Sequence, residues 1–118
     1  MNFLLVGLGG AAGSMARYAV GLAVGGATFP YATLIVNVAG CLGIGVALPS
    51  LDRTSFLSPE MRLLVVVGFL GGFTTFSAFG YEFMALARTS TALAFTNVCA
   101  NVVLGLAAVT IGKMLASP

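Results

Sequence analysis

Two apolar stretches of this chain carry polar residues at helical spacing. They are Thr33, Asn37 and Gly40 in the first stretch and Asn97, Asn101 and Gly105 in the second. An amide side chain in hydrocarbon must find hydrogen-bond partners or contact water, because an unmet polar group there costs several kcal/mol. The two faces therefore indicate either hydrogen bonds between helices or a lined polar pathway. Asparagine N–H groups are donors without a fixed charge, which suits an anion that must bind and leave again.

A third feature, GFLGGFTTFSAF at residues 68–79, interrupts an apolar run with three glycines and two threonines. Non-helical backbone at membrane depth is tolerated only where protein buries it or a polar cavity wets it. In transporters, such breaks expose carbonyl and N–H groups that handle ions. We therefore expect a break at residues 71–75, followed by Phe76 and Phe79 on one face of the helix that resumes.

Composition places these features in a lipid bilayer. Hydrophobic residues make up 59% of the 118 residues and charged residues 7%, and the mean hydropathy is +1.10. A soluble domain carries about 25% charged residues. The net charge of +2 gives nucleic-acid binding no electrostatic basis. The absence of histidine and of paired carboxylates close in sequence argues against an enzyme.

The elements that must position the polar residues are transmembrane helices of about 20 residues each. We expect an all-α membrane protein with a single four-helix transmembrane domain over residues 1–118. Its spans are expected at about 3–24, 31–48, 59–87 and 92–115, with the third broken near 71–75 and the second closed by Pro49. Small residues recur every four positions along the first span, which predicts tight helix contacts; they are Gly9, Gly13, Gly21 and Gly25, with Arg17 in the same register.

Segments of all four spans resemble the fluoride ion channel family (Fluc, also called CrcB). The break resembles the family signature GFxGGxTTFSTF and departs from it at Ala78, where threonine is usual. The first span carries GGAAGSMARY against GGxxGAxxRY, with Ser14 in place of alanine. The second carries TLIVNVAG against TLxVNxxG, and the fourth carries NVCANVVLG, similar to a looser family pattern.

The resemblance implies a passive, fluoride-selective channel that exports cytoplasmic fluoride down its electrochemical gradient. It implies that Asn37, Phe76 and Phe79 line the fluoride path, where the positive edges of the aromatic rings would face the anion. Residues that would complete the path are Ser77, Thr75, Asn97, Asn101 and Thr33. Arg17 is expected at a vestibule of this path.

The resemblance also implies an antiparallel, dual-topology homodimer in the plasma membrane, expected to be a bacterial inner membrane. A structural sodium ion would lie at the dimer interface, held by the backbone carbonyls of Gly71 and Thr74. The charges agree with dual topology, because Arg53, Arg62 and Lys113 fall on one side of a four-span chain and Arg88, with Arg17 nearer to it, on the other. This balance is too even to fix one orientation.

Two rival classes remain open from the residues alone. A small multidrug-resistance-type cation exporter also has four spans, but it needs a carboxylate in the membrane, normally in the first span. The first span here has none, and Glu82 lies near the end of the third. A structural subunit held together by glycine contacts would have no need of the break.

Overall fold

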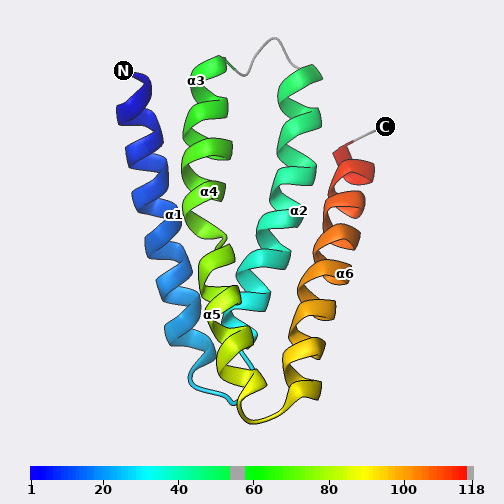
Figure 1. The fold of residues 1–118 in the computed structure, drawn as a ribbon. Coiled ribbons are helices and arrows are strands. Elements are labelled where there is room, and N and C mark those ends of the chain that lie inside the picture. Colours follow the sequence, from blue (N-terminus) through cyan, green and yellow to red (C-terminus); the bar gives the residue numbers. More distant parts are fainter. Residues whose placement is uncertain (54–57, 117–118) are drawn as a thin grey trace.

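The computed structural model describes residues 1–53 and 58–116, in which every regular element is helical (Figure 1). The elements are α1 (Asn2–Val24), α2 (Tyr31–Arg53), α3 (Pro59–Arg62), the π-helix η1 (Leu63–Leu70), α4 (Gly71–Phe73), α5 (Phe76–Ala87) and α6 (Thr91–Ala116). Four helical segments in the described part are long and apolar enough to cross a membrane: Asn2–Val24, Tyr31–Leu51, Pro59–Ala87 and Thr91–Ala116. The expected all-α fold with four spans is confirmed.

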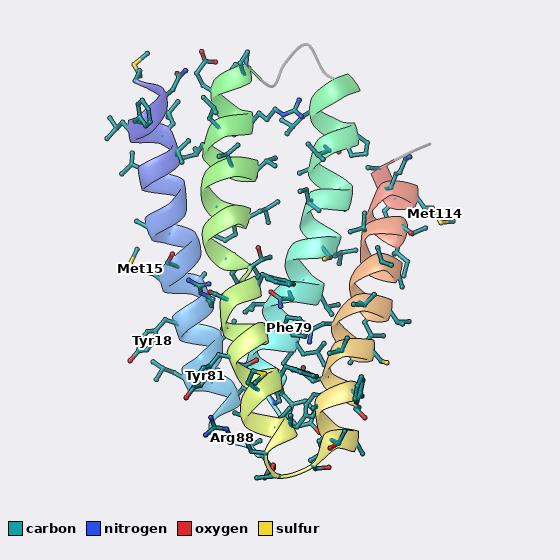
Figure 2. The ribbon with its side chains drawn as sticks, viewed as in Figure 1. Met15, Tyr18, Phe79, Tyr81, Arg88 and Met114 are labelled. Atoms are coloured by element: carbon teal, nitrogen blue, oxygen red, sulfur yellow. The ribbon has the colours of Figure 1, made fainter. Side chains whose placement is uncertain are left out.

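The four spans run alternately up and down (Figure 1). The N-terminus, the end of α2, the start of α3 and the end of α6 lie at one end of the molecule, and the connections α1–α2 and α5–α6 lie at the other. Because of this alternation, α2 and α6 run parallel, and they pack side by side along their length. Met15, Tyr18 and Met114 project from the outer edges, with their side chains largely exposed, as expected of residues that face lipid (Figure 2).

Glycines bring α1 against the upper half of the third span. Gly68 of η1 lies so close to α1 that a Cβ atom there would stand 2.9 Å from the Gly9 Cα. A Cβ at Gly72 would stand 2.5 Å from the Gly10 carbonyl oxygen. In lipid, close backbone approach of this kind is a main source of helix association. The contact therefore depends on glycine on both helices.

The expected glycine contacts of the first span form only in part. Gly9 and Gly13 are buried against the third span, but a Cβ at Gly21 or Gly25 would meet no atom of another element within 4 Å. The reason is that the third span changes partners at its break: η1 and α4 pack on α1, whereas α5 packs on α6. Gly25 serves a different purpose, because it ends α1 with a φ of 73°, a conformation that favours glycine.

The pairing of α2 with α6 has a constant register. Asn37 of α2 is hydrogen-bonded to Asn101 of α6, 64 residues further along the chain. The same separation of 64 residues relates Gly45 to Val109 and Cys41 to Gly105, which also pack against each other. Residue n of α2 therefore lies level with residue n plus 64 of α6. This register fixes which polar residues of the two helices share a depth.

The expected end of the second span at Pro49 is wrong, because α2 continues to Arg53 with Pro49 inside it. Proline removes one backbone donor, but membrane helices tolerate it where side chains compensate for the loss. The carbonyl that loses its helical donor at Pro49 is that of Gly45, and the Ser50 hydroxyl donates to the adjacent Val46 carbonyl at 2.7 Å. The π-helical winding of η1 was not predicted either, since a run of apolar residues gives no signal that separates π from α winding.

Candidate functional site

The third span is interrupted at two residues. Thr74 (φ −81°, ψ 159°) and Thr75 (φ −151°, ψ 121°) are extended, between helical residues that end at Phe73 and resume at Phe76. The expectation of a break is confirmed, but the break is narrower than residues 71–75, because Gly71–Phe73 is helical. Gly72 serves contact with α1, because a Cβ there would stand 2.5 Å from the Gly10 carbonyl oxygen. The two threonines form the break itself.

Asn37 of α2 bonds both backbone groups of Thr75. The Asn37 Oδ1 accepts from the Thr75 N–H at 2.9 Å, and the Asn37 Nδ2 donates to the Thr75 carbonyl at 3.1 Å. In a continuous α-helix the Thr75 N–H would donate to the Gly71 carbonyl instead. A side-chain amide has thus taken over a helical hydrogen bond, which stabilises the extended backbone at membrane depth.

The Thr74 carbonyl has also lost its helical donor. In a continuous helix it would accept from the Ala78 N–H, but Ala78 donates to the Thr75 hydroxyl at 3.3 Å, the N-cap of α5. Arg17 of α1 donates its Nη1 to the Thr74 carbonyl at 3.2 Å. The break therefore releases the carbonyls of Gly71 and Thr74 from the helix, and a cationic side chain binds the second.

Three amide side chains form a hydrogen-bonded row, here called the asparagine row: Asn37, Asn101 and Asn97. The Asn37 Nδ2 donates to the Asn101 Oδ1 at 3.0 Å, and the Asn101 Nδ2 donates to the Asn97 Oδ1 at 2.9 Å and to the Asn97 carbonyl at 3.0 Å. Asn97 is 0% exposed. Its hydrogen-bonded connection to the break runs through Asn101 and Asn37.

Hollows lie on both sides of the break. One of about 330 Å³, the Asn37 hollow, is bordered by Asn37, Gly40, Cys41, Thr74, Thr75 and Phe76, among others. A second of about 560 Å³, the Arg17 hollow, is bordered by Arg17, Thr33, Thr75, Ser77 and Tyr81, among others. Thr75 borders both of them. The extended residue Thr75 thus borders a hollow toward Asn37 and another toward Arg17.

Phe76 and Phe79 stand side by side on α5, as their spacing predicts. Their ring centroids are 5.5 Å apart and the ring planes meet at 50°. Phe76 is 83% exposed, and Phe79 is partly buried and lies within the outline of the helices (Figure 2). Between them in sequence, the Ser77 hydroxyl lies 3.4 Å from the Thr75 hydroxyl. Hydroxyl groups and aromatic edges therefore adjoin the break.

At the edge of the Arg17 hollow, Thr33 of α2 donates its hydroxyl to the Glu82 Oε1 of α5 at 2.5 Å. Sequence reasoning placed Thr33 on the face of Asn37 but did not pair it with Glu82. A carboxylate inside an apolar span needs such a partner, and this was the available signal. Thr33 and Glu82 both border a third hollow of about 400 Å³, here called the Glu82 hollow.

These features define a multi-pass membrane protein with an interrupted spanning helix, an architecture that exposes backbone groups to ions at membrane depth. The chain belongs to the CrcB family: the family model described as "CrcB-like protein, Camphor Resistance (CrcB)" matches residues 4–113. Relatives named "Fluoride-specific ion channel FluC" match over nearly their whole length. The relative from Solibacter usitatus is 47% identical, and the match covers 98% of this chain and 98% of the relative. The relative from Chlorobaculum tepidum is 49% identical, and the match covers 98% of this chain and 94% of the relative. The relative from Chloroflexus aurantiacus is 45% identical, and the match covers 94% of this chain and 91% of the relative.

Proposed function

We propose that the protein is a fluoride-selective ion channel of the cell membrane, which lets the anion leave the cell passively down its electrochemical gradient. The names of the relatives support this, and so does one observation in the structure: an extended backbone segment at membrane depth, held by an amide, between two hollows with hydrogen-bond donors. Passive conduction makes and breaks no covalent bond, so the protein is not an enzyme.

The proposed path begins in the Arg17 hollow. A guanidinium charge attracts an anion more strongly in the low dielectric of a membrane protein than it would in water. The hydroxyls of Ser77 and Thr75 then offer donors at the break. On the other side of the break, the ion would meet Asn37 and the ring of Phe76, whose positive edge is favourable to an anion.

The hydrogen bonds that the Asn37 amide already donates determine how an ion could bind to it. Its two amide hydrogens are used, one by the Thr75 carbonyl and one by Asn101. An anion would therefore bind Asn37 by replacing one of these neutral acceptors. Hydrogen bonds to an ionised acceptor are about twice as strong as those between neutral groups, so fluoride competes well for the hydrogen. The neutral bond re-forms when the ion leaves, which favours release.

Asn97 and Thr33 would act behind the path rather than on it. Asn97 is fully buried and reaches the path through Asn101. Thr33 borders the Arg17 hollow, but its hydroxyl hydrogen is donated to Glu82. The donors that an ion meets directly would then be those of Ser77, Thr75 and Asn37.

We also propose an antiparallel homodimer with a sodium ion between the two breaks. The donor set fits a hard monovalent cation, because the carbonyls of Gly71 and Thr74 have both been released from the helix. Arg17 takes one lone pair of the Thr74 oxygen and leaves the other. Gly71 is exposed, so a second subunit can approach it and supply its own pair of carbonyls. The cation would add positive charge near the anion path.

The geometry of the site does not support the rival proposal of a proton-coupled cation exporter. Glu82 lies in α5 and accepts from Thr33, and the first span, Asn2–Val24, carries no acidic residue. The positive Arg17 side chain adjoins the break and would repel a cationic drug.

The test is efflux from proteoliposomes that contain the purified protein. Vesicles loaded with potassium fluoride should release fluoride rapidly when a potassium ionophore is added, because the ionophore removes the electrical barrier to anion movement. Chloride-loaded vesicles should release little. Comparable chloride efflux would contradict fluoride selectivity, and efflux of neither anion would contradict the channel itself.

A further inference from the structure

Two buried side-chain polar atoms in the described part of the chain have no hydrogen-bond partner, and their chemistry is complementary. They are the Glu82 Oε2, an acceptor, and the Asn97 Nδ2, a donor. A buried polar group without a partner destabilises the fold, and native proteins satisfy nearly all such groups. A pair of this kind at one place therefore points to a missing small ligand.

The register of α2 and α6 brings the two atoms to the same depth. Asn37 is level with Asn101 and Cys41 with Gly105, so Thr33, one turn before Asn37, is level with Asn97. Thr33 in turn holds the Glu82 carboxylate through its Oε1. The rings of Phe83 on α5 and Phe95 on α6 meet edge to face at 6.0 Å, which closes α5 onto α6 beside this place.

We propose that one water molecule is bound between Glu82 and Asn97. The water would accept from the Asn97 Nδ2, donate to the Glu82 Oε2 and donate its second hydrogen to the Thr33 hydroxyl oxygen. Three bonds to polar groups are typical of a buried water. Neither of the two atoms has a hydrogen-bond partner of its own, so each is available to the water. Thr33 and Glu82, which supply two of its three partners, also border the Glu82 hollow.

The water would decide which way the asparagine row points. With the Asn97 Nδ2 held toward Glu82, the Asn97 Oδ1 faces Asn101 and accepts its Nδ2. The Asn101 Oδ1 then faces Asn37, so that the Asn37 Nδ2 points to Asn101 and its Oδ1 accepts from the Thr75 N–H. Asn97 is thus a positioning residue, and Glu82 acts on the break through it. This part of the inference rests on the proposed role of Asn37 in fluoride conduction.

The water is tested first in the wild-type protein, by a crystal structure of the full chain in lipid at about 2 Å resolution. A peak within about 2.7–3.2 Å of both the Glu82 Oε2 and the Asn97 Nδ2 supports the proposal. A direct bond between the two side chains, or an empty gap where other buried waters are visible, overturns it. This measurement does not depend on conduction.

The positioning role is tested by Asn97→Leu, which keeps the volume and removes both the donor and the acceptor. Fluoride efflux should fall about tenfold, the size of one hydrogen bond, and Asn97→Ser, which keeps a donor and an acceptor, should restore most of it. The matched control is Thr96→Val, because the Thr96 hydroxyl bonds only its own helix at Ala92 and its side chain is exposed. Wild-type efflux in Asn97→Leu would refute the positioning role, whereas a wild-type protein without efflux would refute the proposed function.

If the Asn97→Leu protein does not fold, the pair of variants Glu82→Gln and Glu82→Leu separates the outcomes. Glu82→Gln keeps hydrogen-bonding groups for the water and should conduct more than Glu82→Leu, which keeps none. Equal efflux in the two variants would overturn the link between Glu82 and the asparagine row.

Discussion

The amide of Asn37 is bonded to both backbone groups of Thr75, accepting from its N–H at 2.9 Å and donating to its carbonyl at 3.1 Å. One side chain from the second span therefore fixes the one place where the described third span is not helical. The same amide borders the Asn37 hollow, so the residue that holds the break is also the one proposed to meet the ion.

Asn37→Ala should abolish fluoride efflux and also lower stability. The variant leaves the N–H and carbonyl of Thr75 without their partners, at a cost of about 1–3 kcal/mol. The measurements are efflux from proteoliposomes and the midpoint of thermal unfolding in detergent. Thr110→Ala is the control, since the exposed Thr110 hydroxyl bonds only Leu106 of its own helix. Normal efflux in Asn37→Ala would remove this residue from the path.

Replacing Phe76 or Phe79 with isoleucine should reduce fluoride efflux at least tenfold while the protein stays folded. Isoleucine keeps most of the bulk and the apolar character but has no positive ring edge for the anion. The control is Phe3→Ile near the start of α1, whose side chain is exposed and lies outside the proposed path. Wild-type efflux in both test variants would mean that the two rings serve packing alone.

Gly68→Ala should sharply reduce the yield of folded protein. The new Cβ would stand 2.9 Å from the Gly9 Cα and from the Val6 carbonyl oxygen, both backbone atoms that cannot yield without moving α1. Overpacking of this kind costs about 1–3 kcal/mol. Gly7→Ala is the matched control, because a Cβ at Gly7 meets nothing within 4 Å. The comparison is read from size-exclusion profiles of the two variants, and equal profiles would contradict the contact.

How far the sequence predicts this site depends on the type of signal. The break and the two polar faces were predictable, because glycine, threonine and asparagine are conspicuous in apolar spans. The width of the break was not, because Gly71 and Gly72 signal helix contact as readily as interruption. The Arg17 bond to Thr74 and the Thr33 bond to Glu82 join different helices. Their pairing follows from the register of packed spans, which no local pattern records.

The proposed sodium ion should survive Thr74→Ser. Its ligands would be backbone carbonyls, and a serine hydroxyl can still donate to the Leu70 carbonyl, as that of Thr74 does at 3.0 Å. Crystals soaked with a heavier monovalent cation should show an anomalous peak between the Gly71 and Thr74 carbonyls of two subunits, in the wild type and the variant alike. If a well-resolved map shows no density between the Gly71 and Thr74 carbonyls of the two subunits, both the ion and its site are refuted.

The last prediction is that the protein inserts into the membrane in both orientations. The N-terminus and the end of α6 lie at one end of the molecule, together with the start of α3, and Arg88 lies at the opposite end (Figure 2). Basic residues near the first end are Arg53, Arg62 and Lys113. Excess lysine and arginine in cytoplasmic loops normally sets orientation, and here Arg17 lies at the depth of the break and favours neither end decisively.

Antiparallel subunits would also place two equivalent breaks across a two-fold axis in the membrane plane, as a shared cation site requires. A tag at the C-terminus should therefore be labelled by an impermeant reagent in about half of the molecules in intact cells, and in the rest only after the membrane is opened. A variant with extra lysines at the C-terminus serves as the control, because the added positive charge should hold that end inside. Labelling from one side alone in the unmodified protein, with fluoride efflux intact, would contradict dual topology and the antiparallel dimer with it.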